Sequence, residues 1–237
     1  MGAMIMNISA NILGLGNAAT PFGLKAMQEL NTLNTRPGVA TNSMALFLAI
    51  NTSGVAVMLE AMRILKAIGA MPRRTIRVAL WSGEEQGLYG SRAYVRKHFG
   101  DPNLPDVGTT PEYETFSAYF NQDYGPGQYR GIWLQENEHV RQAFQAWMEP
   151  FYDMGMTTIS LQGVGSTDHI AFDDVGLPAF QFLQARVGGT GGHTNLDFFD
   201  TLPIEDLMKN AVIVASFVYH AAMADERLPR KGMPSRH

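Results

Sequence analysis

Residues 77–94 read RVALWSGEEQGLYGSRAY, an apolar run that ends abruptly in two adjacent carboxylates, Glu84 and Glu85. Apolar and β-branched residues followed by glycine are typical of a strand and its turn, so we expect a strand over residues 74–82. The stretch that follows, residues 90–100, is expected to be a helix. Two like charges at a strand end usually mark a solvated turn. They also occur where one carboxylate binds a metal ion and its neighbour moves protons.

The rest of the chain continues this alternation of strands and helices. Further strands are expected over residues 116–123, 157–163 and 178–184, and helices over residues 53–70, 138–155 and 204–226. Gly69 is the expected end of the helix that begins near Ser53. Residues 105–115 and 124–131 are expected to be loop and turn. The pattern predicts an α/β fold, a mostly parallel mixed sheet with helices on both faces.

Composition sets limits on the class of protein. The 237 residues are 46% hydrophobic and 17% charged, as in one globular domain with a full core. A net charge of -4 without a basic block argues against a nucleic-acid partner. With no cysteine, disulfides and thiolate metal sites are excluded. No segment is apolar and long enough to span a membrane, and the uncharged start lacks the basic region of a signal peptide.

Candidate metal ligands lie at the expected strand ends, where ligands bind in open α/β sheets. Asp123 ends the strand expected over residues 116–123, and His193 lies in the glycine-flanked loop GGHTNLD. Together with the paired glutamates these side chains are ligands of the kind that zinc accepts. Asp168 and His169, in GSTDHIAF, could simply be a helix cap and its neighbour.

Four motifs together, WSGEEQGLYGSRAY, NQD, GSTDHIAFDDVGLPAFQF and HTNLD, closely resemble the M28 family of co-catalytic zinc exopeptidases. This family includes aminopeptidases and plasma glutamate carboxypeptidase-like enzymes. The resemblance runs from about residue 51 to about residue 225, most of the chain. It implies a zinc-exopeptidase fold of the phosphorylase/hydrolase-like type over residues 51–237, preceded by an atypical N-terminal segment, residues 1–50.

The resemblance also implies a role for each motif. Glu84 corresponds to the general base, Glu85 and His193 to ligands of the first zinc, and Asp123 to a ligand of the second. Pocket and supporting residues are Ser166, Asp168, His169 and Asp197. In the family, two zincs activate a water that attacks a terminal bond of a peptide or dipeptide. Family members are often secreted or periplasmic, and assembly into a homo-oligomer stays open.

Two family ligands are missing from this chain. Ile50 stands where the family has an aspartate that bridges both metals, Asn51 matches the next family residue, and no histidine precedes them. We therefore expect at most one zinc, bound weakly through Glu85 and His193. The chain is a degenerate family member, a frame-disrupted product, or one whose ligands come from another copy. The change of character near Asn51 favours the second. Alternative functions are a non-catalytic binding domain and acyl transfer as in glutaminyl cyclases.

Overall fold

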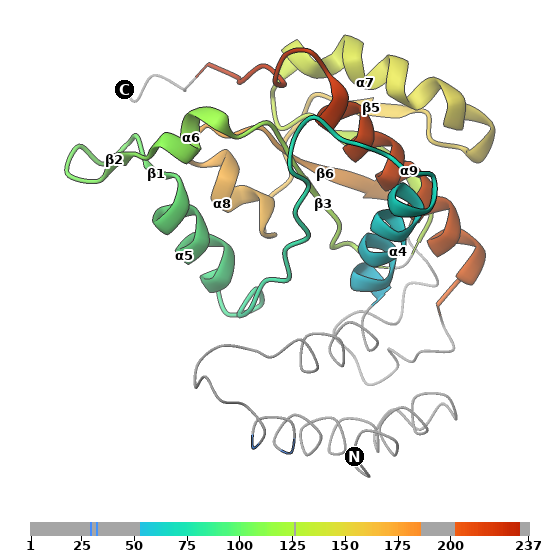
Figure 1. Ribbon diagram of the computed structural model, residues 1–237, viewed down its shortest axis with the longest axis horizontal. Helices are drawn as coiled ribbons and strands as arrows, with labels where there is room; N and C mark the ends of the chain where they lie inside the picture. The colour runs from blue at the N-terminus through green and yellow to red at the C-terminus, as the bar shows by residue number, and fades with distance from the viewer. Residues whose placement is uncertain (1–28, 30–31, 33–52, 126, 186–201, 233–237) are drawn as a thin grey trace.

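A four-stranded mixed sheet forms the centre of the molecule (Figure 1). The computed structural model describes residues 29, 32, 53–125, 127–185 and 202–232. The strands lie in the order β3-β6-β4-β5, with bounds Tyr119–Asn121 (β3), Tyr129–Trp133 (β4), Thr158–Ser160 (β5) and Ala179–Gln184 (β6). β3 runs parallel to β6 and β4 parallel to β5, whereas β4 and β6 are antiparallel. The predicted mixed α/β sheet is therefore confirmed.

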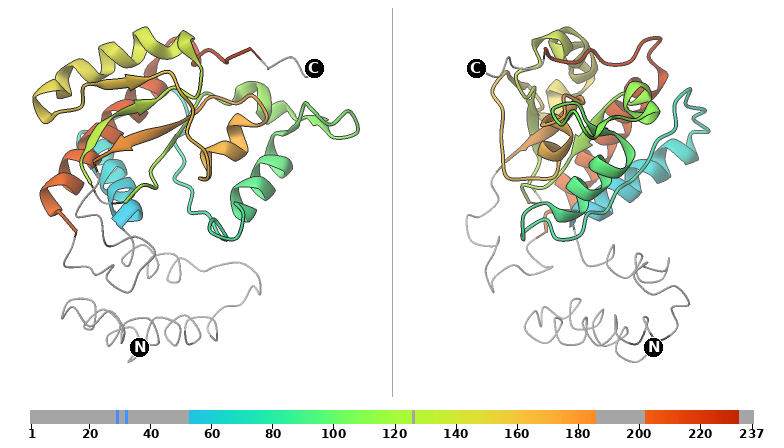
Figure 2. Two further views of the ribbon diagram at one scale, coloured as in Figure 1. Left: turned by 180° about the vertical axis from the view of Figure 1, so that it is seen from behind. Right: turned by 90° about the vertical axis from the view of Figure 1, so that its left-hand side faces the viewer.

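Helices pack on both faces of this sheet, because successive residues of a strand point to opposite sides. Phe120 and Phe180 enter one core, whereas their neighbours Tyr119 and Ala179 contact a second core. The first core is built with α4 (Ser53–Ala67), α7 (Arg141–Met148) and α9 (Ile204–Met223), and the second with α5 (Tyr89–His98), α6 (Pro111–Thr115) and α8 (His169–Asp173). Figure 2 shows α5 and α8 together, apart from the pair formed by α4 and α9.

The helices α4 and α9 pack against each other. Val57, Ala61 and Leu65 of α4 are buried at a spacing of four residues, which places them on one face of the helix. Gly69 follows with a left-handed φ of 67°, and the Ala70 N–H donates to the Leu65 carbonyl at 3.0 Å. A glycine in this conformation satisfies the last carbonyls of a helix. The predicted helix and its glycine stop are confirmed.

Shorter elements lie between these helices and strands. They are β1 (Gly100–Asp101), β2 (Gly108–Thr109) and the 3-10 helices η1 (Glu138–Val140) and η2 (Glu149–Met154). The helix expected over residues 138–155 is thus η1, α7 and η2 in succession, with Pro150 at the start of the last piece. The loop expected over residues 105–115 instead contains β2 and α6. The division of the first helix concerns only local hydrogen-bond spacing, whereas β1, β2 and α6 are short elements that the sequence did not predict.

The expectation of a turn over residues 124–131 is wrong at its end, where β4 begins. Tyr129 is fully buried and stacks on Phe182, with ring centroids 4.3 Å and planes 9° apart. Its backbone N–H donates to the Asn210 side chain of α9 at 2.8 Å. The glycines before this strand, Gly125 and Gly127, are typical of a turn, so the sequence did not indicate a strand here. The strand is buried by α9 and β6, which are distant in the sequence.

The strand predicted over residues 74–82 is also wrong. Within the described part of the chain, residues 75–81 make no backbone–backbone hydrogen bond, and the segment is not a strand. Val78 and Leu80 are 40% and 45% exposed. β3, the edge strand of the sheet, pairs with β6 on one side. Because a strand exists only by pairing with a neighbour, strand-like composition alone does not form one here.

Candidate functional site

The candidate site lies where β3 ends beside the loop that leads into α8. β3 ends at Asn121, two residues before Asp123, and residues 164–168 lead into α8. The Asn121 side-chain amide donates to the Thr167 hydroxyl at 2.7 Å and to the side-chain oxygen of Gln181, in β6, at 2.6 Å. These buried bonds fix the end of β3 against both the loop and the neighbouring strand.

The turn that carries the paired glutamates is held by its own backbone. The N–H of Leu88 donates to the Glu84 carbonyl at 2.9 Å, and the N–H of Gly90 donates to the Ser82 carbonyl at 2.8 Å. Leu88 is buried although its φ is 60°, an unusual value for a residue with a side chain. Glu84 is half-buried, whereas Glu85 is exposed. The two adjacent carboxylates therefore occupy different environments. Such a difference is needed if one of them binds a metal ion and the other transfers protons.

Three carboxylates approach two tyrosines at this edge of the sheet. Burial raises the pKa of the Tyr124 hydroxyl, and the charges of Asp123 and Glu84 raise it further. Burial also raises the pKa of the Tyr119 hydroxyl, with smaller contributions from Asp168 and Asp123. Since such effects fall off with distance, Asp123 lies near both rings, Glu84 near Tyr124 and Asp168 near Tyr119. The structure therefore brings together two predicted site residues, Glu84 and Asp123, with the predicted supporting residue Asp168.

Asp168 is the most deeply placed of these carboxylates. It is only 6% exposed, and burial raises its pKa; the nearby Ser91 hydroxyl opposes this rise, and the Asp123 charge adds to it. Its N–H donates to the Thr167 hydroxyl at 2.8 Å, and its side chain makes no cap bond at the start of α8. Among the described residues its Oδ1 has no partner. The simple helix-cap interpretation of Asp168 is therefore wrong.

The other two residues of this predicted supporting segment lie differently. Ser166 is exposed, with a left-handed φ of 63°. His169 is fully buried, and desolvation lowers its pKa to about 4, so the ring is neutral at pH 7. Its Nε2 lies 3.0 Å from the Val164 carbonyl and therefore carries the proton that is donated to it. His169 supports the loop from inside the protein.

Sequence reasoning missed the polar residues behind the carboxylates. The Trp81 indole donates to the Tyr119 hydroxyl at 2.9 Å, and that hydroxyl in turn donates to the Asn121 side chain. Trp81 and Asn121 lie within quoted motifs, but no signal in the sequence pairs them with Tyr119. The Trp81–Tyr119 bond joins residues 38 apart, and Asn121, two residues from Tyr119, carries no mark of its bond. Tyr124, next to Asp123, was likewise missed.

A metal ion would need more donors than the described residues bring together. Among them, no three His, Asp or Glu side chains are close enough to hold one. Glu84, Glu85 and Asp123 are oxygen donors of the kind zinc accepts, but catalytic zinc normally takes three protein ligands. The described residues alone therefore do not fit a complete zinc site. His193 and Asp197, and the positions Ile50 and Asn51, lie outside the described residues, so their roles stay predictions.

Comparison with known proteins gives matches to one family over most of the chain. The model of peptidase family M28 matches residues 51–218. Aminopeptidase YwaD of Bacillus subtilis (strain 168) is 28% identical over 190 residues, which are 75% of this chain and 38% of that protein. A solved peptidase M28 precursor from Shewanella amazonensis SB2B has a TM-score of 0.64 at 24% identity, over 76% of this chain and 39% of that one. The chain thus spans about two fifths of the length of these relatives.

A second match is short and concerns a different protein. Spore maturation protein A of Bacillus subtilis (strain 168) is 53% identical over 53 residues, which are 22% of this chain and 27% of that protein. Fewer than 20 residues follow residue 218, where the first match ends. Outside the first match, only the segment before residue 51 is long enough to contain most of this stretch.

Proposed function

This chain belongs to peptidase family M28, and we propose that its carboxylate site is built for hydrolysis of a terminal peptide bond. The observation that supports this most directly is the position of Asp123 near both Tyr119 and Tyr124, with Glu84 near Tyr124 and Asp168 near Tyr119. The site also lies where β3 ends and a loop crosses to α8, the usual place for ligands in an open α/β sheet. The substrate is a peptide or dipeptide, held by one free end.

Glu84 is assigned the role of general base. It is half-buried and sits on a turn fixed by backbone bonds, so its carboxylate is held in place while it takes a proton from water and passes it to the leaving amine. Glu85, Asp123 and His193 are assigned to the metal. Zinc, when bound, would polarise the scissile carbonyl and lower the pKa of the attacking water. Asp197 is assigned to orienting His193.

The supporting residues act through the loop before α8. Ser166, Asp168 and His169 set the wall of the site next to Asp123, with Asp168 inside and Ser166 at the surface. A buried carboxylate of raised pKa next to another carboxylate limits the negative charge that the site must hold. Peptide side chains would lie along the exposed side of this wall.

We propose that this chain binds at most one zinc, weakly, through Glu85 and His193. Ile50 offers no lone pair where the resemblance requires a bridging carboxylate, and no histidine precedes it. Loss of a direct ligand should weaken metal binding by more than the 10- to 100-fold typical of residues that only support ligands. Turnover should therefore be far below that of a complete family member, and Ile50→Asp alone should not restore it.

The test combines metal analysis with a peptidase assay. Protein purified without chelator is analysed for zinc and assayed for amino-acid release from dipeptides and aminoacyl-anilides with added zinc. Two zincs per chain and chelator-sensitive turnover that Glu84→Gln lowers at least about 100-fold would establish the exopeptidase and contradict the predicted ligand shortage. Glu205→Gln, on the exposed start of α9, is the control.

Other outcomes support other functions. One zinc with cyclisation of N-terminal glutamine would favour acyl transfer of the glutaminyl-cyclase kind. No zinc and no turnover would favour a non-catalytic binding domain.

The short match to spore maturation protein A supports a related proposal, that residues 1–50 come from a different protein family and take the place of the peptidase's first strands. Sequencing of the genomic region across codon 51 would decide it.

A further inference from the structure

Gln135 lies two residues after the end of β4 and clamps the loop that leads into α8. Its side-chain oxygen accepts the Val164 N–H at 2.7 Å, and its side-chain N–H donates to the Val164 carbonyl at 3.0 Å. Gln135 is only 3% exposed and has a φ of 49°, in the left-handed region that residues with side chains rarely occupy. An amide that makes both bonds to one residue reproduces the pairing of two strands and fixes the position and the orientation of Val164.

The loop held at Val164 is the one that carries the site residues. His169 donates to the same Val164 carbonyl from inside the protein, at 3.0 Å. From the opposite side, the hydroxyl of Tyr124 donates to the Gly165 carbonyl at 2.9 Å. Asp168 follows three residues after Gly165. Its place beside Asp123 therefore depends on a loop that is pinned at two consecutive residues.

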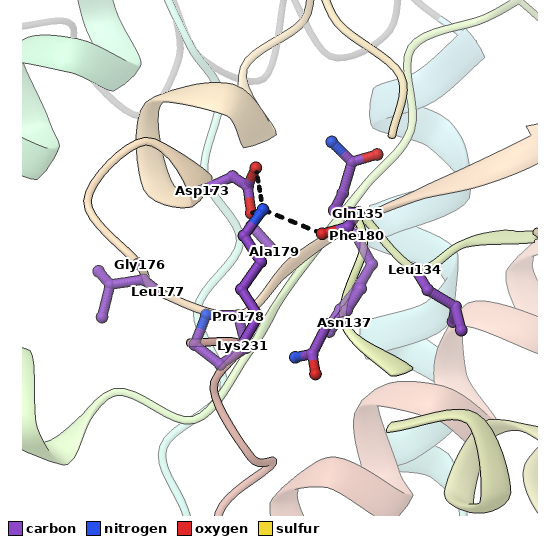
Figure 3. Close-up of a pocket in the computed structure, with 10 residues that line it drawn as sticks. All are labelled: Leu134, Gln135, Asn137, Asp173, Gly176, Leu177, Pro178, Ala179, Phe180 and Lys231. Atoms are coloured by element: carbon purple, nitrogen blue, oxygen red, sulfur yellow. Dashed lines mark hydrogen bonds and ion pairs between the residues drawn. The ribbon is translucent and has the colours of Figure 1, made fainter. Parts of the chain in front are cut away.

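Gln135 is itself held by the C-terminal tail (Figure 3). The Lys231 ammonium donates to the Gln135 backbone carbonyl at 2.9 Å and forms an ion pair with Asp173, at the end of α8, at 2.7 Å. The Asn137 amide donates to the Pro229 carbonyl at 2.8 Å, which ties down the same tail. Figure 3 shows the Lys231 side chain between the two acceptors. The tail thus connects the end of β4 with the end of α8.

We propose that Gln135 is a positioning residue of the site: through Val164 it sets the loop over residues 164–168, and Lys231 holds Gln135 in place. The role of this loop in catalysis rests on the proposed function. The clamp, which is the pair of hydrogen bonds between Gln135 and Val164, does not depend on that function. The alternative is that Gln135 only fills space at the end of β4. The two differ in what happens when the amide is replaced by a group of the same size.

The first test is amide hydrogen exchange of the full chain, followed by mass spectrometry. Gln135→Met keeps the side-chain volume but removes both bonds to Val164. Peptides covering residues 163–170 should exchange about tenfold faster or more relative to the unmodified chain, as expected for loss of two neutral hydrogen bonds. Peptides of α9 should be unchanged. Gln145→Met, at an exposed position of α7, is the matched control and should leave both regions unchanged.

The second variant, Gln135→Glu, separates clamping from space filling. A carboxyl group can make both bonds to Val164 only while it is protonated, since a carboxylate has no hydrogen to donate. The charged and titratable groups around position 135 are Lys231, Asp173, Glu136 and His169. Burial at this 3% exposed position raises the pKa of the new carboxyl above the ordinary value of about 4.3, and Lys231 opposes this rise. Loop exchange should be about tenfold faster than in the unmodified chain at about pH 8, and this ratio should fall toward one as the pH is lowered toward about 4.

The possible results separate the clamp from the proposed function. The proposal is overturned if Gln135→Met leaves loop exchange unchanged, if it raises exchange equally in α9, or if Gln135→Glu shows no dependence on pH. Because amide exchange needs neither metal nor substrate, a chain without peptidase activity gives the same readout. Loss of the clamp with unchanged turnover would contradict the proposal, and an intact clamp in a chain that binds no zinc and has no turnover would contradict only the peptidase assignment.

Discussion

Gly90 stands where no side chain fits. A Cβ at this position would lie 2.6 Å from the carbonyl oxygen and 2.7 Å from the nitrogen of Ser82, both backbone atoms of the turn that carries Glu84. Gly90→Ala should therefore lower the free energy of unfolding by about 1–3 kcal/mol, the usual cost of overpacking. Urea denaturation of the variant measures this. Gly232→Ala, where a Cβ would meet nothing within 4 Å, should leave stability unchanged.

His169 should make stability depend on pH. Its pKa in the folded protein is about 4, below the value of about 6.5 in an unfolded chain, because burial disfavours the charged ring. The unfolded state therefore binds more protons between these values, and the stabilisation is complete above about pH 6.5 and lost as pH falls toward about 4. At about pH 5 the chain should be about 2 kcal/mol less stable from this group alone than at about pH 7.5.

The variant His169→Gln isolates this contribution. A glutamine amide can still donate to the Val164 carbonyl but does not titrate. The difference in unfolding free energy between about pH 7.5 and about pH 5 should shrink by about 2 kcal/mol in the variant, measured by urea denaturation at both values. An equal pH dependence in both proteins would show that His169 is not the group responsible.

At the residue scale, the motifs identified the acidic residues of the site but not the polar residues that hydrogen-bond behind them. The pair Glu84–Glu85 and Asp123 were found because four motifs together resemble one peptidase family, although each motif alone is weak. Tyr119, Asn121 and Thr167 could not be found, because the hydrogen bonds Trp81–Tyr119 and Asn121–Thr167 join segments distant in sequence. Such networks follow from the fold and have no local pattern.

At the scale of elements, segment 75–81 should make the protein self-associate. It exposes Val78 and Leu80 and, within the described residues, offers unpaired backbone groups to another chain. Sedimentation velocity should show association of the unmodified chain at about 100 µM and less of it after Val78→Lys with Leu80→Lys. Met71→Lys, at an 87% exposed position outside the segment, should not reduce it. A monomeric unmodified chain at that concentration would contradict this.

The same segment shows why some elements could be predicted and others could not. In α4 and α9 the spacing of the apolar residues shows which face of the helix is buried. This spacing lies within each helix, so it can be detected in a single sequence. Residues 74–82 have the composition of a strand, but composition does not report whether a neighbouring strand is present. β4 is the opposite case, a strand hidden by turn residues and stabilised by Asn210 and Phe182 from elsewhere in the chain.

For the whole molecule, the two comparisons agree with the change of character near Asn51. The family match begins at residue 51 and ends at residue 218, and the chain covers only 38% of the matched aminopeptidase. Length and composition predicted one domain with a full core, and within the described residues two cores do form, one on each face of the sheet. The division into residues 1–50 and 51–237 stays a prediction, since the first part lies almost entirely outside the described residues.

The pairing of α4 with α9 also bears on synthesis at the ribosome. The two helices are more than 130 residues apart in the sequence, yet they pack face to face. Among the described elements, α9 makes the most extensive contact with α4, so the buried side of α4 lacks its main partner until α9 emerges. At roughly 5–20 residues per second that wait lasts several seconds or more. Contacts between such distant segments also slow folding. During this interval α4 is a natural binding site for chaperones, and slower translation of the last third of the message should lengthen its exposure.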